Sequence, residues 1–252
     1  MTRFAVVVPA RLGSTRLPSK PLLRETGKYL VQHVVERALE APGVVRVVVA
    51  TDDDQVDAAV RSFGGEAVRT RLDHRSGSDR CAEVAEHLTE DVVVNVQGDE
   101  PLFEPKDLAT LAAHAARPEN DMATLAFPVK DPAEAASPHV VKVVTRADGS
   151  ALYFSRAPIP FDRATGGPAT SARAHVGIYA FRRERLLAYS RLPVGTLAAA
   201  ESLEQLRALE AGWRIAVLPA SVPAFGVDTS ADYARFVSTI RSQEAAAPRA
   251  AT

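Results

Sequence analysis

Three cationic side chains lie in one short segment that follows the first strand-like part of the sequence. Residues 9–22 have the sequence PARLGSTRLPSKPL, which includes Arg11, Arg16 and Lys20. Arginine binds phosphate oxygens through paired hydrogen bonds, and lysine acts as a point charge. The backbone at Gly13 and Ser14 can turn N–H groups toward an anion. These features favour binding of a nucleoside triphosphate.

The same segment also has a simpler interpretation as a solvated basic loop. It contains neither the G-x-x-x-x-G-K-[ST] pattern of P-loop enzymes nor the G-x-G-x-x-G pattern of dinucleotide-binding folds. Its position after a buried strand nevertheless favours the binding interpretation, because open α/β sheets bind ligands at the carboxyl ends of their strands.

Two aspartates are candidates for a metal site. Asp99, in the sequence QGDEP, directly follows the apolar run 92–96, and Asp228 lies in the sequence GVDT. Magnesium in nucleotide sites takes one or two carboxylates together with phosphate oxygens and waters. The alternatives are that Asp99 belongs to a turn and that Asp228 caps the last helix. The acidic run 52–54 is interpreted mainly as a helix N-terminus, with Asp52 as a further neighbour of the nucleotide.

Alternating strands and helices must position these residues. The apolar runs 4–8, 44–50 and 92–96 predict buried strands, and apolar residues at helical spacing predict helices over 30–39, 55–63 and around 82–88. This order implies βαβ units, and therefore an α/β, Rossmann-like fold with a mostly parallel central sheet and helices on both faces.

The second half of the sequence is less regular. Strands are predicted over 122–129, 140–145, 151–155 and 176–181, a Pro-rich irregular loop over 158–168, and a helical stripe over 203–213. No internal repeat or linker is evident. We therefore expect a single domain over 1–243, with a sugar-binding and dimerisation portion around 140–210, and a disordered tail over 244–252.

Composition narrows the class of protein. The 252 residues carry 30 Lys and Arg against 31 Asp and Glu, which argues against a nucleic-acid-binding surface. The single cysteine, Cys81, excludes an intramolecular disulfide and fits a reducing compartment. No apolar run is long enough for a membrane span. With no secretion signal evident, we expect a cytoplasmic protein.

Several long motifs, in order along the chain, resemble those of one enzyme family. They are PARLGSTRLPSKPL, RSGSDRCAEV, VNVQGDEPL, VKVVT, ALYFSRAPIPFDR, HVGIYAFR, ESLEQLR and GVDT. Together they resemble the 3-deoxy-manno-octulosonate (KDO) cytidylyltransferases, over roughly residues 4–236. The resemblance implies a nucleotide-diphospho-sugar transferase fold. It also implies CMP transfer from CTP to the anomeric hydroxyl of KDO, which releases pyrophosphate and activates the sugar for lipopolysaccharide synthesis. A homodimer formed through residues 140–181 is implied too.

The resemblance also assigns residues to roles. The catalytic residues would be Lys20, Arg11, Asp99 and Asp228, with Mg²⁺ held by Asp99 and Asp228. The nucleotide would be bound by Arg11, Gly13, Ser14, Arg16, Lys20, Arg80 and Gln97. The acidic sugar would be bound by Arg156, His175, Tyr179, Glu204 and Gln205.

Some of these residues have other interpretations from the sequence alone. Arg80, in the first turn of a helix, faces either a phosphate or an internal ion-pair partner, while Ser78 is expected to cap that helix. His175 and Tyr179 could be packing residues, and Glu204 could be a solvated charge paired with Arg207.

The sequence departs from the family pattern at three places. Ser19 replaces a common glycine before the lysine, and serine tolerates fewer backbone conformations. Tyr29 replaces a common proline, and residues 196–200 lack a common acidic residue. These departures leave an 8-amino analogue of KDO open as the substrate. Other hypotheses are a different nucleotide or sugar, a catalytically silent nucleotide-binding subunit, and a glycosyltransferase with 52–54 as its metal motif.

Overall fold

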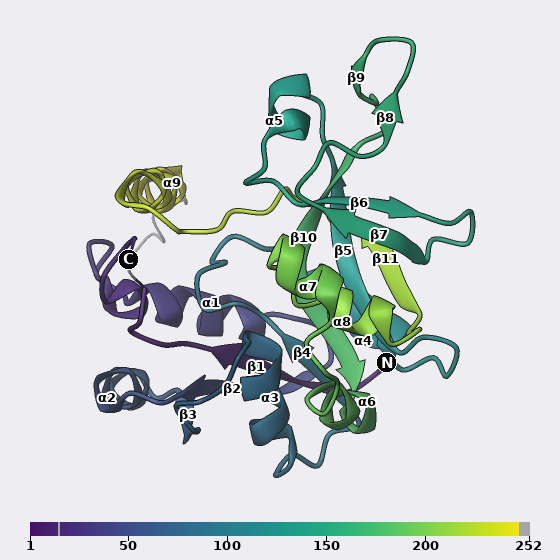
Figure 1. Cartoon of the computed structure of the whole chain (residues 1–252). Helices are drawn as coiled ribbons and strands as arrows, with labels where there is room; N and C mark the ends of the chain where they lie inside the picture. The colour runs from purple at the N-terminus through teal and green to yellow at the C-terminus, as the bar shows by residue number, and fades with distance from the viewer. Residues whose placement is uncertain (15, 247–252) are drawn as a thin grey trace.

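One central sheet organises the protein, seen in a computed structural model that describes residues 1–14 and 16–246 (Figure 1). Its strand order is β11-β5-β10-β4-β1-β2-β3. The bounds of these strands are β1 (Phe4–Pro9), β2 (Val44–Thr51), β3 (Glu66–Arg69), β4 (Val92–Asn95), β5 (Met122–Pro128), β10 (Arg173–Arg182) and β11 (Ile215–Pro219). Strand β10 is antiparallel to its neighbours β4 and β5, whereas the other pairs along this path are parallel. The predicted mostly parallel α/β sheet is confirmed.

Helices cover both faces of this sheet. Alternate residues of strand β1 point to opposite faces and pack against the helices on each side. Phe4, Val6 and Val8 pack into one apolar cluster, and Ala5 and Val7 pack into another. The first cluster lies under α1 (Leu30–Leu39), α2 (Asp54–Ser62) and α4 (Pro105–Ala115). The second lies under α3 (Gly77–Ala85), α6 (Arg183–Tyr189), α7 (Thr196–Glu201) and α8 (Leu206–Glu210).

An antiparallel extension continues from β10. Strand β6 (Lys142–Thr145) pairs with both β10 and β7 (Ala151–Ser155). The segment predicted as an irregular loop over 158–168 instead contains the short antiparallel pair β8 (Phe161–Asp162) and β9 (Gly167–Pro168). In Figure 1 this pair projects from the top of the molecule, above the short helix α5 (Pro132–Ala136).

The predicted helical stripe over 203–213 is only partly helical. Helix α8 spans five residues, because Ser202 ends α7 in a left-handed conformation with φ 52° and the next residues form turns. The apolar side chains Leu203 and Leu206 are still buried, which explains why the sequence shows a helical spacing there.

A third, smaller apolar cluster connects the two ends of the chain. Leu17 of the N-terminal loop and Leu30 of α1 pack against Tyr233, Phe236 and Val237 of α9 (Ser230–Ala246). Residues 244–246, predicted as part of a disordered tail, belong to this helix, and 247–252 lie outside the described residues. Within residues 1–14 and 16–246, no helix is both long and apolar enough to cross a membrane.

Candidate active site

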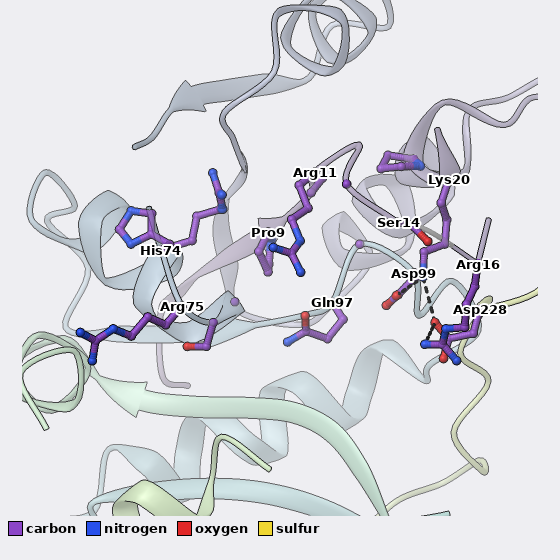
Figure 2. A pocket seen from close by; sticks show the side chains of 17 residues that line it. Pro9, Arg11, Ser14, Arg16, Lys20, His74, Arg75, Gln97, Asp99 and Asp228 are labelled. Carbon is purple, nitrogen blue, oxygen red and sulfur yellow. Dashed lines mark hydrogen bonds and ion pairs between the residues drawn. The ribbon is translucent and has the colours of Figure 1, made fainter. Parts of the chain in front are cut away.

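A cavity of about 370 Å³ opens where β1 and β4 end, and the residues predicted for nucleotide binding and catalysis line it (Figure 2). Its volume lies in the range of small-molecule sites. The predicted residues among its walls are Arg11, Gly13, Ser14, Arg16, Lys20, Arg80, Gln97, Asp99 and Asp228. Residues as far apart in the sequence as Arg11, Asp99 and Asp228 are thus brought to one edge of the sheet.

Lys20 lies between the two predicted metal ligands. Its Nζ is 2.5 Å from Asp99 Oδ2 and 3.0 Å from Asp228 Oδ1. Arg16 reaches the same Asp228 oxygen at 3.1 Å. Burial alone would lower the pKa of Lys20, but the adjacent carboxylates of Asp99 and Asp228 raise it above its ordinary value. Lys20 therefore remains an ammonium and balances both carboxylates.

Backbone contacts hold the two aspartates in this position. The amide of Val227 donates to the carbonyl of Asp99 at 2.9 Å, which joins the segment after β4 to the segment before α9. Asp232 accepts the amide hydrogen bonds of Asp228 and Thr229 at the start of α9. The alternative that Asp228 caps this helix is therefore not supported, and its side chain faces Lys20 instead.

The pair of carboxylates fits a divalent cation that binds together with a triphosphate. Both present one oxygen to the same cationic atom, so a metal ion could take that place with a ligand from each. In the described part of the chain, no three His, Cys, Asp or Glu side chains converge as a possible metal site. Two protein ligands completed by phosphate oxygens and waters is the arrangement that Mg²⁺ favours.

Glu100 is a neighbour that the sequence analysis missed. Burial, together with the charge of Asp99, raises its pKa to about 8, and its Oε2 accepts a hydrogen bond from the amide of Phe225 at 3.2 Å. The raised pKa favours the protonated form of this carboxyl group, which reduces the negative charge beside the two aspartates. Its burial depends on tertiary packing, which the sequence pattern around QGDEP does not reveal.

Ser19 has the unusual backbone that its place in the loop requires. Its φ is 52° and its ψ is 27°, in the left-handed region that favours glycine. Serine at this position therefore introduces local backbone strain, and the loop still delivers Lys20 to the carboxylates.

The opposite end of the cavity is formed by Gln97 and by the start of α3. A Cβ atom on Gly98 would lie 2.9 Å from the carbonyl oxygen of Pro9, and one on Gly77 would lie 3.1 Å from Gln97 Oε1. Glycine at both positions allows the ends of β1, β4 and α3 to approach closely. His74 and Arg75 also line this end, and Figure 2 shows them far from Lys20. The sequence analysis did not single out His74.

Two expectations for α3 are resolved by the structure. Arg80 donates to Asp52 at 2.7 Å, so the internal ion pair is formed, although Arg80 still lines the cavity. Ser76, not Ser78, is the N-cap, since its side chain accepts from the amide of Asp79. The prediction for Ser78 was wrong because the helix begins one residue before it, at Gly77. The acidic run was interpreted correctly, because Asp53 caps α2.

The residues predicted for the sugar form a second group beside α8. Tyr179 donates to Gln205 Oε1 at 3.1 Å, and both side chains are buried. Among the described residues, no partner is present for the buried Nε2 of Gln205. His175 lies beside Tyr179 and Phe154, with ring centroids 5.5 Å and 4.9 Å away. Desolvation lowers the pKa of His175 to about 3, so this ring is neutral at physiological pH rather than a cation.

Arg156 and Glu204 flank this group. The guanidinium of Arg156 donates to the carbonyl oxygens of Glu201 at 2.8 Å and Pro138 at 3.0 Å, which orient it without neutralising its charge. Glu204 is not a solvated charge paired with Arg207: it accepts from the amide of Ser78 at 3.4 Å, and burial raises its pKa. Arg156 is therefore the charged group of this set that suits an anion.

Comparisons with known proteins identify the family of this chain. Residues 5–215 match the family described as Cytidylyltransferase. The chain is 49% identical to a 3-deoxy-manno-octulosonate cytidylyltransferase of Escherichia coli, over 92% of this chain and 93% of that protein. It is 51% identical to one from Anaeromyxobacter sp. strain Fw109-5, over 99% and 100% of the two chains. A solved structure of CMP:2-keto-3-deoxy-manno-octonic acid synthetase complexed with CTP superposes with a TM-score of 0.89 at 45% identity, covering 96% of this chain and 100% of that one. The chain belongs to the cytidylyltransferase family.

Proposed function

We propose that this cytidylyltransferase transfers CMP from CTP to KDO and releases pyrophosphate. The observation that carries the proposal is the convergence of Lys20, Asp99 and Asp228 at one end of a nucleotide-sized cavity. The names of the relatives support CTP as the donor and KDO as the acceptor. The fold class and the family follow from the matches above, whereas the roles of individual residues are part of this proposal.

The nucleotide is proposed to lie along the cavity, with its phosphates near the cationic loop. Within residues 1–14 and 16–246, no ion pair engages Arg11, and Figure 2 shows its side chain above Gln97 and to the left of Lys20. The amide of Gln97 has hydrogen-bonding groups of the kind that read the edge of a pyrimidine. Gly13 is proposed to supply a backbone N–H group and Ser14 its hydroxyl, because the amide of Ser14 already donates to the carbonyl of Leu12 at 2.8 Å.

The proposed chemistry is a displacement at the α-phosphorus. The anomeric oxygen of the sugar forms the new bond to phosphorus, the bond to the bridging oxygen of pyrophosphate breaks, and the hydroxyl proton passes to solvent. Arg11, Arg16 and Lys20 neutralise charge on the phosphates and on the departing pyrophosphate. Asp99 and Asp228 would hold Mg²⁺, which polarises phosphate oxygens and the attacking hydroxyl when bound. The protein otherwise contributes orientation of the two substrates.

The acceptor is proposed to bind beside α8. Arg156 supplies the positive charge for the sugar carboxylate, while Tyr179, His175 and the unpartnered Nε2 of Gln205 supply hydrogen-bonding groups for its hydroxyls. Glu204, which lies between α7 and α8 and contacts the N-terminus of α3, is proposed to act at the same site. An 8-amino analogue of KDO has the same carboxylate, so a direct comparison of the two acceptors defines the substrate.

We also propose a domain organisation, an oligomeric state and a cellular compartment for the protein. We treat residues 1–243 as a single domain in which 140–210 binds the sugar and contributes to a homodimer through 140–181. We also place the reaction in the cytoplasm, with neither nucleic acid nor membrane as a partner. Light scattering with the purified protein tests the dimer, and a monomer at micromolar concentration would contradict it.

The proposed reaction is tested by pyrophosphate release from a panel of nucleoside triphosphates and acidic sugars. We expect turnover with CTP, KDO and Mg²⁺, and loss of at least a thousandfold in kcat for Asp99→Ala with an unchanged circular dichroism spectrum. Asp57→Ala serves as the control, since Asp57 pairs with Arg61 on the surface of α2. Turnover with another substrate pair only, or near-normal rates for Asp99→Ala, would overturn the substrate or the metal assignment, respectively.

A further inference from the structure

A buried ion pair joins the acceptor side of the protein to the helix that borders the nucleotide cavity. Arg207, in α8, donates through Nη1 to both carboxylate oxygens of Asp79, in α3, at 2.9 Å and 3.1 Å. Arg207 is 5% exposed and Asp79 is 8% exposed. Ion pairs of this kind require good geometry because burial of both charges is costly. Neither residue lines the cavity, so the pair has no direct contact with the proposed nucleotide site.

The same two elements meet again at the N-terminus of α3. The half-buried carboxyl group of Glu204 accepts a hydrogen bond from the amide of Ser78 and also contacts the hydroxyl groups of Ser76 and Ser78. A carboxylate at this end of a helix is favoured by the helix dipole. Ser76 lines the nucleotide cavity, whereas Glu204 directly precedes Gln205 of the proposed acceptor site.

The hydrogen bonds continue from Ser78 to Gln97, where the pyrimidine base is proposed to bind. The hydroxyl of Ser78 accepts from Asn95 Nδ2 at 3.1 Å, and Asn95 Oδ1 accepts from Gln97 Nε2 at 3.3 Å. Glu204, Ser78, Asn95 and Gln97 therefore form a continuous polar path between the two proposed substrate sites. Displacement of Glu204 would first break its hydrogen bond to Ser78, at the end of the path beside the proposed acceptor site.

The far side of Arg207 is also fixed. Its Nη2 donates to the carbonyl of Leu192 at 2.6 Å, and its guanidinium lies 4.7 Å from the centre of the Tyr189 ring. Tyr189 in turn donates through its hydroxyl to the carbonyl of Glu204 at 2.7 Å. Arg207 is thus held from three directions, and one of these contacts, with Tyr189, leads back to the segment that carries Glu204 and Gln205.

We propose that Arg207 and Asp79 are positioning residues that set the acceptor site against the nucleotide site. The proposal rests on the function proposed above and adds a role for two residues that touch neither substrate. The ion pair holds α8 at a defined distance from α3, which places Glu204 and Gln205 relative to Ser76 and the phosphate end of the cavity. In-line displacement depends on this alignment, and small misplacement is costly in rate.

When the Arg207–Asp79 ion pair is broken, we expect residues 202–205, rather than α3, to move. Helix α3 is nine residues long, seven of them buried, and its apolar side chains Cys81, Ala82, Val84 and Ala85 pack on the sheet. Residues 202–205 instead form turns between two short helices, α7 and α8. Loss of the pair should therefore loosen 202–205 and leave the nucleotide cavity largely unchanged.

The test compares Arg207→Met with Arg185→Met, because Arg185 forms a similar but more exposed ion pair and belongs to neither proposed substrate site. Arg185 pairs with Asp121 and lies 4.6 Å from the centre of the Trp213 ring, much as Arg207 lies over Tyr189. Among the described residues, each of these arginines also has a buried Nε without a partner. Urea unfolding gives the free energy of unfolding of each variant. The control then shows how much of a change in kinetics follows from lost stability alone.

We expect Arg207→Met to raise the KM for the acceptor at least tenfold and to lower kcat, while the Kd for CTP with Mg²⁺ changes less than threefold. Arg185→Met should leave all three values within about threefold of the wild type. Hydrogen exchange should show faster exchange of the 202–206 amides in Arg207→Met only. Similar kinetic values for the two variants, or a larger change for CTP than for the acceptor, would overturn the proposal.

A double variant distinguishes a positioning role of the ion pair from the cost of leaving one buried charge without its partner. Asp79→Asn with Arg207→Met removes both charges and keeps an acceptor for the Ser76 hydroxyl, so it should recover stability relative to Arg207→Met alone. We expect the acceptor KM to stay raised, and its return to the wild-type value would refute a positioning role. If the proposed function is wrong, the wild type itself shows no turnover with CTP and KDO. The hydrogen-exchange comparison still tests the ion pair in that case, since it needs no substrate.

Discussion

Replacing Lys20 by methionine isolates the electrostatic balance at the centre of the cavity. The substitution keeps an unbranched side chain but removes the ammonium that lies between Asp99 and Asp228. Asp99 then loses its counter-charge, while Asp228 keeps only its contact with Arg16 at 3.1 Å. Breaking a fully buried ion pair costs about 3–5 kcal/mol, and an exposed pair is worth less than about 1 kcal/mol. The aspartate side chains are 33% and 43% exposed, so we expect a loss of about 1–3 kcal/mol in unfolding free energy.

Magnesium should reverse this loss in the variant. The ammonium and a divalent cation compete for the same two carboxylates, so removal of Lys20 should tighten binding of a metal ion in the absence of nucleotide. A ligand that binds only the folded state stabilises it by RT ln(1 + [L]/Kd). At a metal concentration ten times Kd, this amounts to about 1.4 kcal/mol, which is comparable with the expected loss.

The assay is urea unfolding followed by circular dichroism at low ionic strength, in EDTA and in millimolar Mg²⁺. Manganese binding measured by electron paramagnetic resonance gives the metal Kd directly. Lys28→Met is the control, since Lys28 pairs with Glu36 on the surface. We expect that control to show little loss and no dependence on metal. Equal stability of Lys20→Met and wild type in EDTA, or equal or weaker Mn²⁺ binding by the variant, would refute the competition between Lys20 and the metal.

Three further predictions concern the loop, the acceptor site and the C-terminal helix. Ser19→Gly should raise the unfolding free energy by about 0.5–1 kcal/mol in urea, because glycine adopts the left-handed backbone at φ 52° without strain; a decrease would contradict this. The pKa of His175 is about 3 in the folded protein and about 6.5 when unfolded, so the unfolded chain binds the extra proton and stability falls as the pH drops below 6.5. His175→Gln should therefore reduce the loss of stability between pH 7 and pH 5 by about 1–2 kcal/mol in urea titrations at each pH, and an unchanged loss would contradict the shift. Phe236→Ala should cost about 3–5 kcal/mol in urea unfolding and raise the Mg²⁺ concentration needed for half-maximal activity, because Asp228 lies only two residues before the start of α9; an unchanged Mg²⁺ requirement would separate the helix from the site.

The sequence predicted the cavity better than the acceptor side. Arg11, Lys20 and Asp99 each follow a buried strand, and parallel strands bring their carboxyl ends to one edge, so spacing alone indicated that they meet. Asp228 was found only as a candidate, because its approach to Asp99 depends on the packing of α9 against the loop.

The acceptor side depends on contacts that no local pattern reveals. Arg207 and Glu204 have the spacing of a surface ion pair on a helix, yet Arg207 pairs with Asp79 and Glu204 contacts α3. Arg80 shows the same limit: its helical position indicated an acidic or phosphate partner, and only the fold shows that Asp52 supplies the acid. In each case the choice between partners is made by tertiary packing.

The third apolar cluster has a consequence for the synthesis of the protein. The loop that carries Lys20 emerges from the ribosome early, but its partner Asp228 comes 208 residues later. At typical elongation rates of about 5–20 residues per second, the loop waits roughly 10–40 s for that partner. The central sheet lacks only its edge strand β11 once residue 182 has emerged, whereas the carboxylate pair requires α9 to dock on Leu17. A nascent or truncated chain can therefore have a folded sheet and still lack the site until α9 has been synthesised and has docked.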